Sequence, residues 1–146
     1  MTVNPKYVDG HGMLAGKNVL ITAAAGSGIG FATAKRCLEE GARVVISDKH
    51  ERRLGESAAE LGVLGVPCDV TVEESVQGLF TAAVTHFGQI DVLINNAGLG
   101  GTAELHEMTD DQWSIVLDVT LNGTFRCMRT ALNYMYAQGH GVIVNN

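Results

Sequence analysis

The sequence predicts an α/β fold with a doubly wound parallel sheet, and three observations support this prediction. Five short apolar runs rich in valine and isoleucine recur along the 146 residues. Amphipathic segments separate them, so that five strands alternate strictly with four helices. The apolar runs are nearly continuous rather than alternating with polar residues, which indicates strands that are buried on both faces. A chain of this length has room for one domain with a sizeable core.

The expected strands follow the apolar runs in chain order. They lie at residues 17–23, 42–48, 62–70, 91–97 and 141–146. Residues 1–13 are expected to form a loose N-terminal arm. No internal repeat, low-complexity tract or interdomain linker interrupts residues 14–146, which form the predicted domain.

Start and stop signals define three of the helices. The first is expected from residue 28 to residue 40, because a glycine follows at position 41. Thr71 and Glu74 form a capping box that is expected to open the next helix, which ends at Gly88. Thr109 and Gln112 form a second box, at the start of one long helix that runs to about residue 136. This helix carries a mostly apolar stripe that comprises Trp113, Val116, Leu117, Thr120, Leu121, Thr124, Phe125, Met128 and Leu132.

Composition and charge disfavour several classes of protein. The formal net charge is −6 and the ten basic residues are scattered, which disfavours a nucleic-acid surface. No apolar stretch approaches the roughly 20 residues of a membrane helix and the N-terminus lacks a secretory pattern, so we expect a cytoplasmic protein. Cys37, Cys68 and Cys127 are far apart and are expected to be reduced, buried thiols. The five histidines lack metal-ligand spacing, and we expect no metal site.

A glycine-rich stretch joins the first expected strand to the first expected helix. Residues 22–30 read TAAAGSGIG and place Gly26, Gly28 and Gly30 in this turn. Glycine allows the backbone to approach a ligand, and the following helix N-terminus suits a pyrophosphate. The alternative interpretation is a glycine-rich turn without a ligand.

An acidic residue ends the second expected strand. Asp48 lies eighteen residues after Gly30, where its carboxylate can accept hydrogen bonds from both hydroxyls of an adenosine ribose. It would repel a 2′-phosphate, so it favours NAD over NADP, although Lys49, Arg52 and Arg53 can soften that preference. A helix N-cap is the alternative role of Asp48.

The third and fourth expected strands also end in polar residues. Asp69 can accept a hydrogen bond from the amino group of adenine, and a capping or turn role before Thr71 is the alternative. Asn95, Asn96 and Gly98 end the fourth strand, where the middle of a dinucleotide would pass. Buried amides need hydrogen-bond partners, so a pair of asparagines at this point is not explained by core filling.

Together these motifs resemble the short-chain dehydrogenase/reductase family. The strand–AAAGSGIG–helix unit, Asp48, CDV at 68–70, NNAG at 95–98 and W…LDVTLNGTF at 113–125 occur in the family's order and spacing. The resemblance extends from residue 14 to the end of the chain. It implies a Rossmann fold, represented by an NAD-binding domain that contains the first five strands and lacks the C-terminal strands and helices. VVISDKHERRLGE and NNAGLGG further resemble a bacterial sterol-degradation branch, whose members act on a ring hydroxyl or ketone of steroid-derived CoA thioesters.

The resemblance also implies roles for individual residues. The implied cofactor-binding residues are Ala24, Gly26, Ser27, Gly28, Ile29, Gly30, Asp48, Asp69, Val70, Asn96, Ala97, Gly98 and Val119. Of these, 27–29 would contact the pyrophosphate, Asp48 the ribose, 69–70 the adenine, and Val119 the nicotinamide side. The chain departs from the family at two points. The usual Thr-Gly opening of the loop falls on alanines 23 and 24, and the catalytic asparagine falls on Thr120, which is the candidate catalytic residue.

The implied function is NAD(H)-dependent hydride transfer between nicotinamide and a secondary alcohol or ketone. In the family, the catalytic serine, tyrosine and lysine follow the fifth strand, so we expect residues 1–146 to be the cofactor-binding front part of an enzyme. The resemblance implies a homo-oligomer that pairs the long helices, whereas packing of that helix on its own sheet is the alternative. A non-catalytic dinucleotide-binding scaffold is the second functional hypothesis. An FMN-binding flavodoxin-like protein fits poorly, because it needs no acidic residue after the second strand.

Overall fold

The computed structural model describes residues 7–100 and 103–146 and confirms the doubly wound parallel sheet. In the described residues the strands are β1 Asn18–Ile21, β2 Arg43–Asp48, β3 Leu64–Pro67, β4 Val92–Asn95 and β5 Val142–Asn145. They are ordered β3-β2-β1-β4-β5, and every neighbouring pair is parallel. The strand order reverses between β1 and β4, so a crevice opens at the carboxyl ends of these strands.

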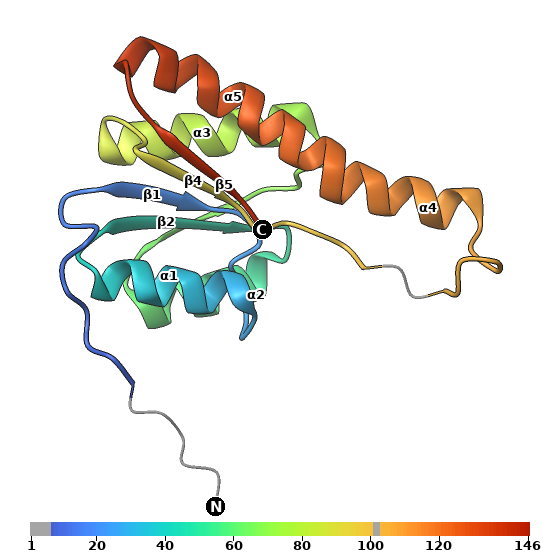
Figure 1. The fold of residues 1–146 in the computed structure, drawn as a ribbon, viewed down its shortest axis with the longest axis horizontal. Coiled ribbons are helices and arrows are strands. Elements are labelled where there is room, and N and C mark those ends of the chain that lie inside the picture. Colours follow the sequence, from blue (N-terminus) through green and yellow to red (C-terminus); the bar gives the residue numbers. More distant parts are fainter. Residues whose placement is uncertain (1–6, 101–102) are drawn as a thin grey trace, which may run out of the picture.

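Helices cover both faces of the sheet (Figure 1). The helical elements are α1 Ile29–Glu39, α2 Glu51–Leu61, α3 Glu73–Phe87, α4 Asp110–Leu117, the π-helical turn η1 Asp118–Asn122, and α5 Gly123–Gln138. Helices α1 and α2 lie on one face, and α3 and α5 lie on the other. Helix α2 is the helix that strict alternation requires between the second and third strands.

The core consists of two apolar layers, one on each side of the sheet. Leu20 and Leu93 pack toward α3 and α5, whereas Val19, Ile21 and Ile46 pack toward α1 and α2. All five side chains are fully buried. Successive strand residues point to opposite faces, so a strand covered on both sides needs apolar residues at every position. This explains the continuous apolar runs of the sequence.

The expected capping box at Thr71 is wrong. Helix α3 begins at Glu73 with Val72 as its N-cap, and no side chain caps it. The Asp69 carboxylate instead accepts hydrogen bonds from both the backbone amide and the hydroxyl of Thr71, at 2.9 and 2.7 Å. The hydroxyl is therefore engaged in a turn before the helix, and Thr71 lies one residue outside the N-cap position.

The single long helix expected from 109 to about 136 is interrupted. Its capping box is confirmed, because the Thr109 hydroxyl accepts from the Gln112 amide and the Gln112 side chain accepts from the Thr109 amide. The helix then widens at η1, where the Gly123 amide donates to the carbonyl of Asp118, five residues earlier. Gly123 packs so closely on Val70 that a Cβ there would lie 2.7 Å from Val70 Cγ2. This tertiary contact accompanies the irregular turn.

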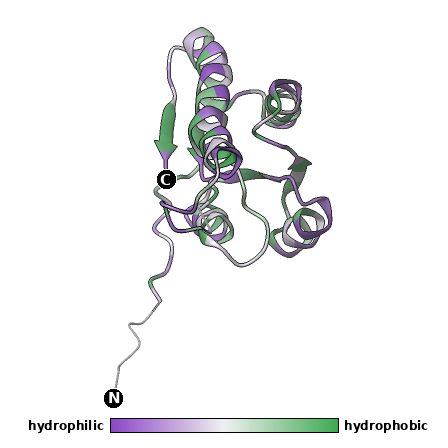
Figure 2. Ribbon diagram, turned by 90° about the vertical axis from the view of Figure 1, so that its right-hand side faces the viewer, coloured by the Kyte–Doolittle hydropathy of each residue, from purple (hydrophilic) through white to green (hydrophobic). Residues whose placement is uncertain are grey.

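The predicted apolar stripe of the long helix faces outward. The residues of α5 that are buried lie on a different face, namely Gly123, Cys127, Thr130, Ala131 and Met135. None of the stripe residues is buried, and Leu121 and Phe125 are 61% and 56% exposed. Helix α4 has no buried residue and extends beyond the sheet (Figure 1). The helices in Figure 2 carry both hydrophobic and hydrophilic residues, as expected for amphipathic elements.

The expected N-terminal arm lies only partly within the described residues, since 1–6 fall outside them. Residues 7–13 contain no helix or strand. The backbone amides of His11 and Met13 donate to the buried Glu40 carboxylate at 2.8 and 3.1 Å. This segment therefore contacts the C-terminal end of α1. Within the described ranges, no helix combines the length and hydrophobicity that crossing a bilayer requires.

Candidate functional site

The loop between β1 and α1 presents an uncapped helix N-terminus. Gly28 is the N-cap of α1 and has no side chain with which to cap it. The first N–H groups of a helix lack intrahelical partners and carry a partial positive charge. A Cβ at Gly28 would meet nothing within 4 Å, so this position faces open space, and Ile29 is 68% exposed. An anion can therefore approach the backbone here.

The other two glycines of the loop are explained by backbone conformation and by packing. Gly26 has a φ of +83°, which favours glycine. Gly30 is buried, and a Cβ there would lie 2.5 Å from the Ala23 carbonyl oxygen and 2.6 Å from Asn96 Nδ2. Gly30 thus allows α1 to pack tightly against the ends of β1 and β4.

Thr22 and Ala23 form the start of the loop. The Thr22 hydroxyl accepts hydrogen bonds from the amides of Asn96 and Ala97, both at 3.0 Å. Ala23 follows with a φ of +51°, the conformation that glycine adopts without strain. Ala24 is fully buried and donates its amide to Ser47, so it lies behind the loop surface.

The Asp48 carboxylate lies at the carboxyl end of β2, beside this loop. It accepts hydrogen bonds from the amide of His50 at 2.9 Å and from the amide of Ala25 at 3.4 Å. The N-cap of α2 is His50, so Asp48 is not the helix cap that we considered as an alternative. The two amides orient the carboxylate toward the crevice, where it also lines a cavity.

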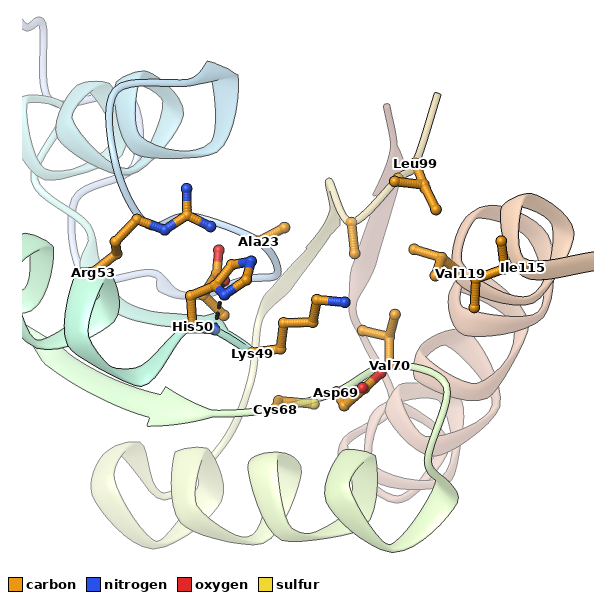
Figure 3. Close-up of a pocket in the computed structure, with 13 residues that line it drawn as sticks. Ala23, Lys49, His50, Arg53, Cys68, Asp69, Val70, Leu99, Ile115 and Val119 are labelled. Carbon is orange, nitrogen blue, oxygen red and sulfur yellow. Dashed lines mark hydrogen bonds between the residues drawn. The ribbon is translucent and has the colours of Figure 1, made fainter. Parts of the chain in front are cut away.

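A cavity of about 250 Å³ gathers most of the residues at the carboxyl ends of the strands. Its lining residues are Ala23, Asp48, Lys49, His50, Arg53, Cys68, Asp69, Val70, Ala97, Gly98, Leu99, Ile115 and Val119. Figure 3 shows Arg53, His50 and Lys49 on one side, and Leu99, Ile115 and Val119 on the other. The cavity thus has a charged wall and an apolar wall, an arrangement that suits a flat base attached to a sugar.

Asp69 has the turn role that the sequence offered as an alternative, and it also lies at the cavity. Its Oδ1 accepts both hydrogen bonds of the Thr71 turn, and the residue also lines the cavity. The amide of Thr71 contributes most to holding the pKa of Asp69 below its usual value. The group is therefore an anion at neutral pH and serves as a hydrogen-bond acceptor.

The asparagines at the end of β4 are braced by a second pair at the end of β5. Asn95 Nδ2 donates to Asn145 Oδ1 at 2.9 Å, and Asn146 Nδ2 donates to Asn96 Oδ1 at 3.0 Å. Asn96 Nδ2 also donates to the Ala23 carbonyl at 2.9 Å. These bonds join the ends of β1, β4 and β5, and they account for strand-end amides that core filling does not explain.

The structure brings Val119 into the same cavity as Asp48, whereas Thr120 lies next to it, outside the lining. The Thr120 hydroxyl contacts the backbone of Leu99 in the loop after β4. Sequence reasoning did not name His50, Leu99 or Ile115 as site residues, although all three line the cavity. No motif marks these positions in the sequence.

The thiols and potential metal ligands add no further site within the described residues. All three cysteines are buried and unpaired, as predicted. Burial raises the pKa of Cys127 to about 12, which keeps its thiol protonated. Residues 7–100 and 103–146 contain no cluster of three or more His, Cys, Asp or Glu side chains arranged for a metal ion.

The comparisons with known proteins agree on one family. A family model described as short chain dehydrogenase matches residues 17–146. A Mycobacterium tuberculosis protein named (5R,7aS)-5-hydroxy-7a-methyl-1-oxo-2,3,5,6,7,7a-hexahydro-1H-indene-carboxyl-CoA reductase is 56% identical over 153 aligned positions. The match covers 100% of this chain and 58% of that protein. The chain thus spans less than two thirds of the length of this relative.

Solved structures share the fold closely. The crystal structure of a short chain dehydrogenase from Mycobacterium smegmatis is similar with a TM-score of 0.93 and 55% identity, over 97% of this chain and 61% of that one. A xylitol dehydrogenase with bound NAD+ has a TM-score of 0.83 and 37% identity, over 91% of this chain and 53% of that one. An actinorhodin polyketide ketoreductase variant with NADPH has a TM-score of 0.84 and 36% identity, over 91% of this chain and 54% of that one.

Proposed function

Because the chain belongs to the short-chain dehydrogenase family of oxidoreductases, we propose that it binds NAD(H) in the crevice at the carboxyl ends of its strands. The bound cofactor supplies or accepts a hydride, and the reaction partner is a secondary alcohol or ketone. The observation that carries this proposal is the cavity that joins Asp48, Asp69 and the apolar wall, and that includes Ala23 from the loop before the uncapped N-terminus of α1.

Each part of this crevice suits one part of a dinucleotide. The backbone around Ser27, Gly28 and Ile29 would bind the pyrophosphate at the positive end of α1. Asp48 would accept hydrogen bonds from the adenosine ribose. Asp69 and Val70 lie where they can flank the adenine. Val119 lines the same cavity as Asp48, so we now assign it to the adenosine half rather than to the nicotinamide side.

We propose a preference for NAD over NADP that is incomplete. Asp48 is a buried carboxylate at the cavity and would repel a 2′-phosphate. Lys49 and Arg53 line the same cavity, and neither forms an ion pair within the described residues. Both cofactors occur among the structural relatives, with NAD+ in the xylitol dehydrogenase and NADPH in the ketoreductase.

We propose that the substrate is a ring hydroxyl or ketone on a carboxyl-CoA thioester. The support is the name of the Mycobacterium tuberculosis relative, a reductase of a hydroxylated, methylated indene-carboxyl-CoA. Hydride transfer to a ketone also needs a proton donor at the oxygen. The Tyr7 hydroxyl donates a hydrogen bond to Glu39, and the Tyr134 ring stacks on Phe80, so neither tyrosine is placed to donate a proton at the cavity. We therefore assign to the described residues the binding and orientation of the cofactor.

Calorimetric titration with NADH tests this proposal. We expect saturable binding, and we expect Asp48→Asn to weaken it by about 1.5–3 kcal/mol, the value of a hydrogen bond to a charged group. Glu60→Gln, an exposed charge removal on α2, serves as the control and leaves the affinity unchanged. Absence of binding by both NADH and NADPH would contradict the proposal, and an unchanged affinity of Asp48→Asn would contradict the ribose role.

A further inference from the structure

One side chain holds the apolar wall of the cavity in place. The Thr120 hydroxyl accepts a hydrogen bond from the Leu99 amide at 3.1 Å and donates to the Leu99 carbonyl at 3.4 Å. A single hydroxyl therefore pairs with both polar backbone groups of one loop residue. These bonds join η1 to the loop after β4, across 21 residues of sequence.

The π-helical turn places this hydroxyl. Thr120 is the central residue of η1, and its carbonyl accepts a hydrogen bond from the Thr124 hydroxyl at 2.8 Å. The close contact of Gly123 with Val70 fixes the turn against the end of β3. Gly98 lies beside the hydroxyl, since a Cβ there would be in ordinary van der Waals contact with Thr120 Oγ1 at 3.9 Å. The position of Thr120 is thus set by several elements.

The residue that Thr120 holds faces the proposed ligand. Leu99 lines the cavity together with Ile115 and Val119, opposite Lys49 and His50 (Figure 3). Leu99 is 43% exposed, so burial contributes only part of what fixes its position. Among the described residues, the two bonds to Thr120 are the side-chain hydrogen bonds that fix its backbone.

We propose that Thr120 is a positioning residue, which fixes Leu99 as the apolar wall of the adenosine cavity and so controls dinucleotide affinity. This inference rests on the proposed function. It replaces the expectation that Thr120 is a catalytic residue, because its hydroxyl both donates to and accepts from the Leu99 backbone.

The test uses ADP-ribose as a probe, because this molecule has the adenosine half but no nicotinamide. We expect Thr120→Val, which keeps the shape and removes the hydroxyl, to raise the Kd of both ADP-ribose and NADH about tenfold. Thr120→Ser keeps the hydroxyl and is expected to bind both within about twofold of the wild type. Thr81→Val is the matched control, since its hydroxyl bonds only the Gln77 carbonyl on α3.

A second variant tests the same wall without touching the hydroxyl. Leu99→Ala is expected to raise the Kd of ADP-ribose, and adding Thr120→Val to it should have little further effect, since both changes act through one wall. This variant is informative even if Thr120→Val fails to fold, because Leu99 is partly exposed.

Two outcomes separate this inference from the proposed function. Wild-type affinity for ADP-ribose in Thr120→Val, or additive effects in the double variant, would overturn the positioning role while leaving dinucleotide binding intact. If the wild-type protein bound neither ADP-ribose nor NADH, the proposed function itself would fail. Loss of binding in Thr120→Ser equal to that in Thr120→Val would also overturn the inference.

Discussion

At the scale of single residues, Ala23 has the most unusual backbone of the site. It is the one non-glycine residue with positive φ among the described residues. An L-residue in this conformation is strained by roughly 1–2 kcal/mol. Its carbonyl accepts the hydrogen bond of Asn96 Nδ2, and Gly30 packs directly on it, so the surrounding contacts impose the conformation. An alanine gives no sequence signal for such a backbone.

This strain predicts a stabilising substitution. We expect Ala23→Gly to raise the free energy of unfolding by about 0.5–1 kcal/mol, because glycine adopts positive φ without strain. Ala25→Gly, two residues on and without positive φ, should lower it by a similar amount through the entropy of the unfolded chain. Urea denaturation measures both. If the two variants were equally destabilised, the strain at Ala23 would not exist.

The cations after β2 predict a difference between cofactors. Arg53 lines the cavity, whereas Arg52 is 81% exposed and pairs with Glu56 at 2.8 Å. Arg53→Gln should therefore weaken NADPH about tenfold, the effect of losing one charged hydrogen bond, and change NADH little. Arg52→Gln is the matched control and should change neither. Equal effects of the two substitutions on NADPH in a competition titration would exclude a specific role for Arg53.

At the scale of elements, the apolar runs and one capping box predicted the fold well, whereas no sequence pattern predicted the irregular turns. The strands follow directly from runs that are buried on both faces, and Thr109 caps α4 as its sequence indicates. The box at Thr71 failed because α3 begins one residue later than the box requires, with Val72 as its N-cap, while Thr71 forms a turn with Asp69. The π turn η1 accompanies the contact of Gly123 with Val70, which lies far away in sequence and has no local pattern.

The contact between residues 7–13 and α1 predicts a pH dependence. The amides of Met13 and His11, with Arg36, hold the pKa of Glu40 below its ordinary value. The folded pKa is thus below the unfolded value of about 4.3, so ionised Glu40 stabilises the contact above that pH. The stabilisation is lost as the pH falls through the folded pKa.

We therefore expect the amides of His11 and Met13 to lose protection from hydrogen exchange below about pH 4. In Glu40→Gln the same amides should exchange rapidly at neutral pH, and the acid-induced loss should disappear. Acid-resistant protection of both amides in the wild type would contradict the role of Glu40.

At the scale of the whole molecule, the sequence predicted the layers of the fold and the polar residues at the strand ends, but not which helix face is buried. The acidic and glycine residues at strand ends meet in one crevice because parallel strands place their carboxyl ends together. The apolar stripe of the long helix was correctly identified as apolar, yet α5 buries Cys127 and Ala131 instead. Periodicity shows that a stripe exists, whereas packing on α3 decides which side faces inward.

The exposed stripe predicts self-association of the protein. Leu121 and Phe125 form part of an exposed apolar face on η1 and α5, and such faces commonly mark interfaces. We expect light scattering to show an oligomer, and Phe125→Asp to shift it toward the monomer. Met13→Asp, which alters an exposed apolar residue near α1, should leave the assembly unchanged. A wild-type protein that is monomeric at all concentrations would contradict this expectation.

The most direct measurement is a crystal structure of the protein with NADH. The account predicts density for the diphosphate at the amides of residues 27–30, with a ribose hydroxyl on Asp48. It also predicts the adenine between Asp69 and the wall formed by Leu99 and Val119. A dinucleotide bound away from the N-terminus of α1, or with its adenosine outside this cavity, would contradict it.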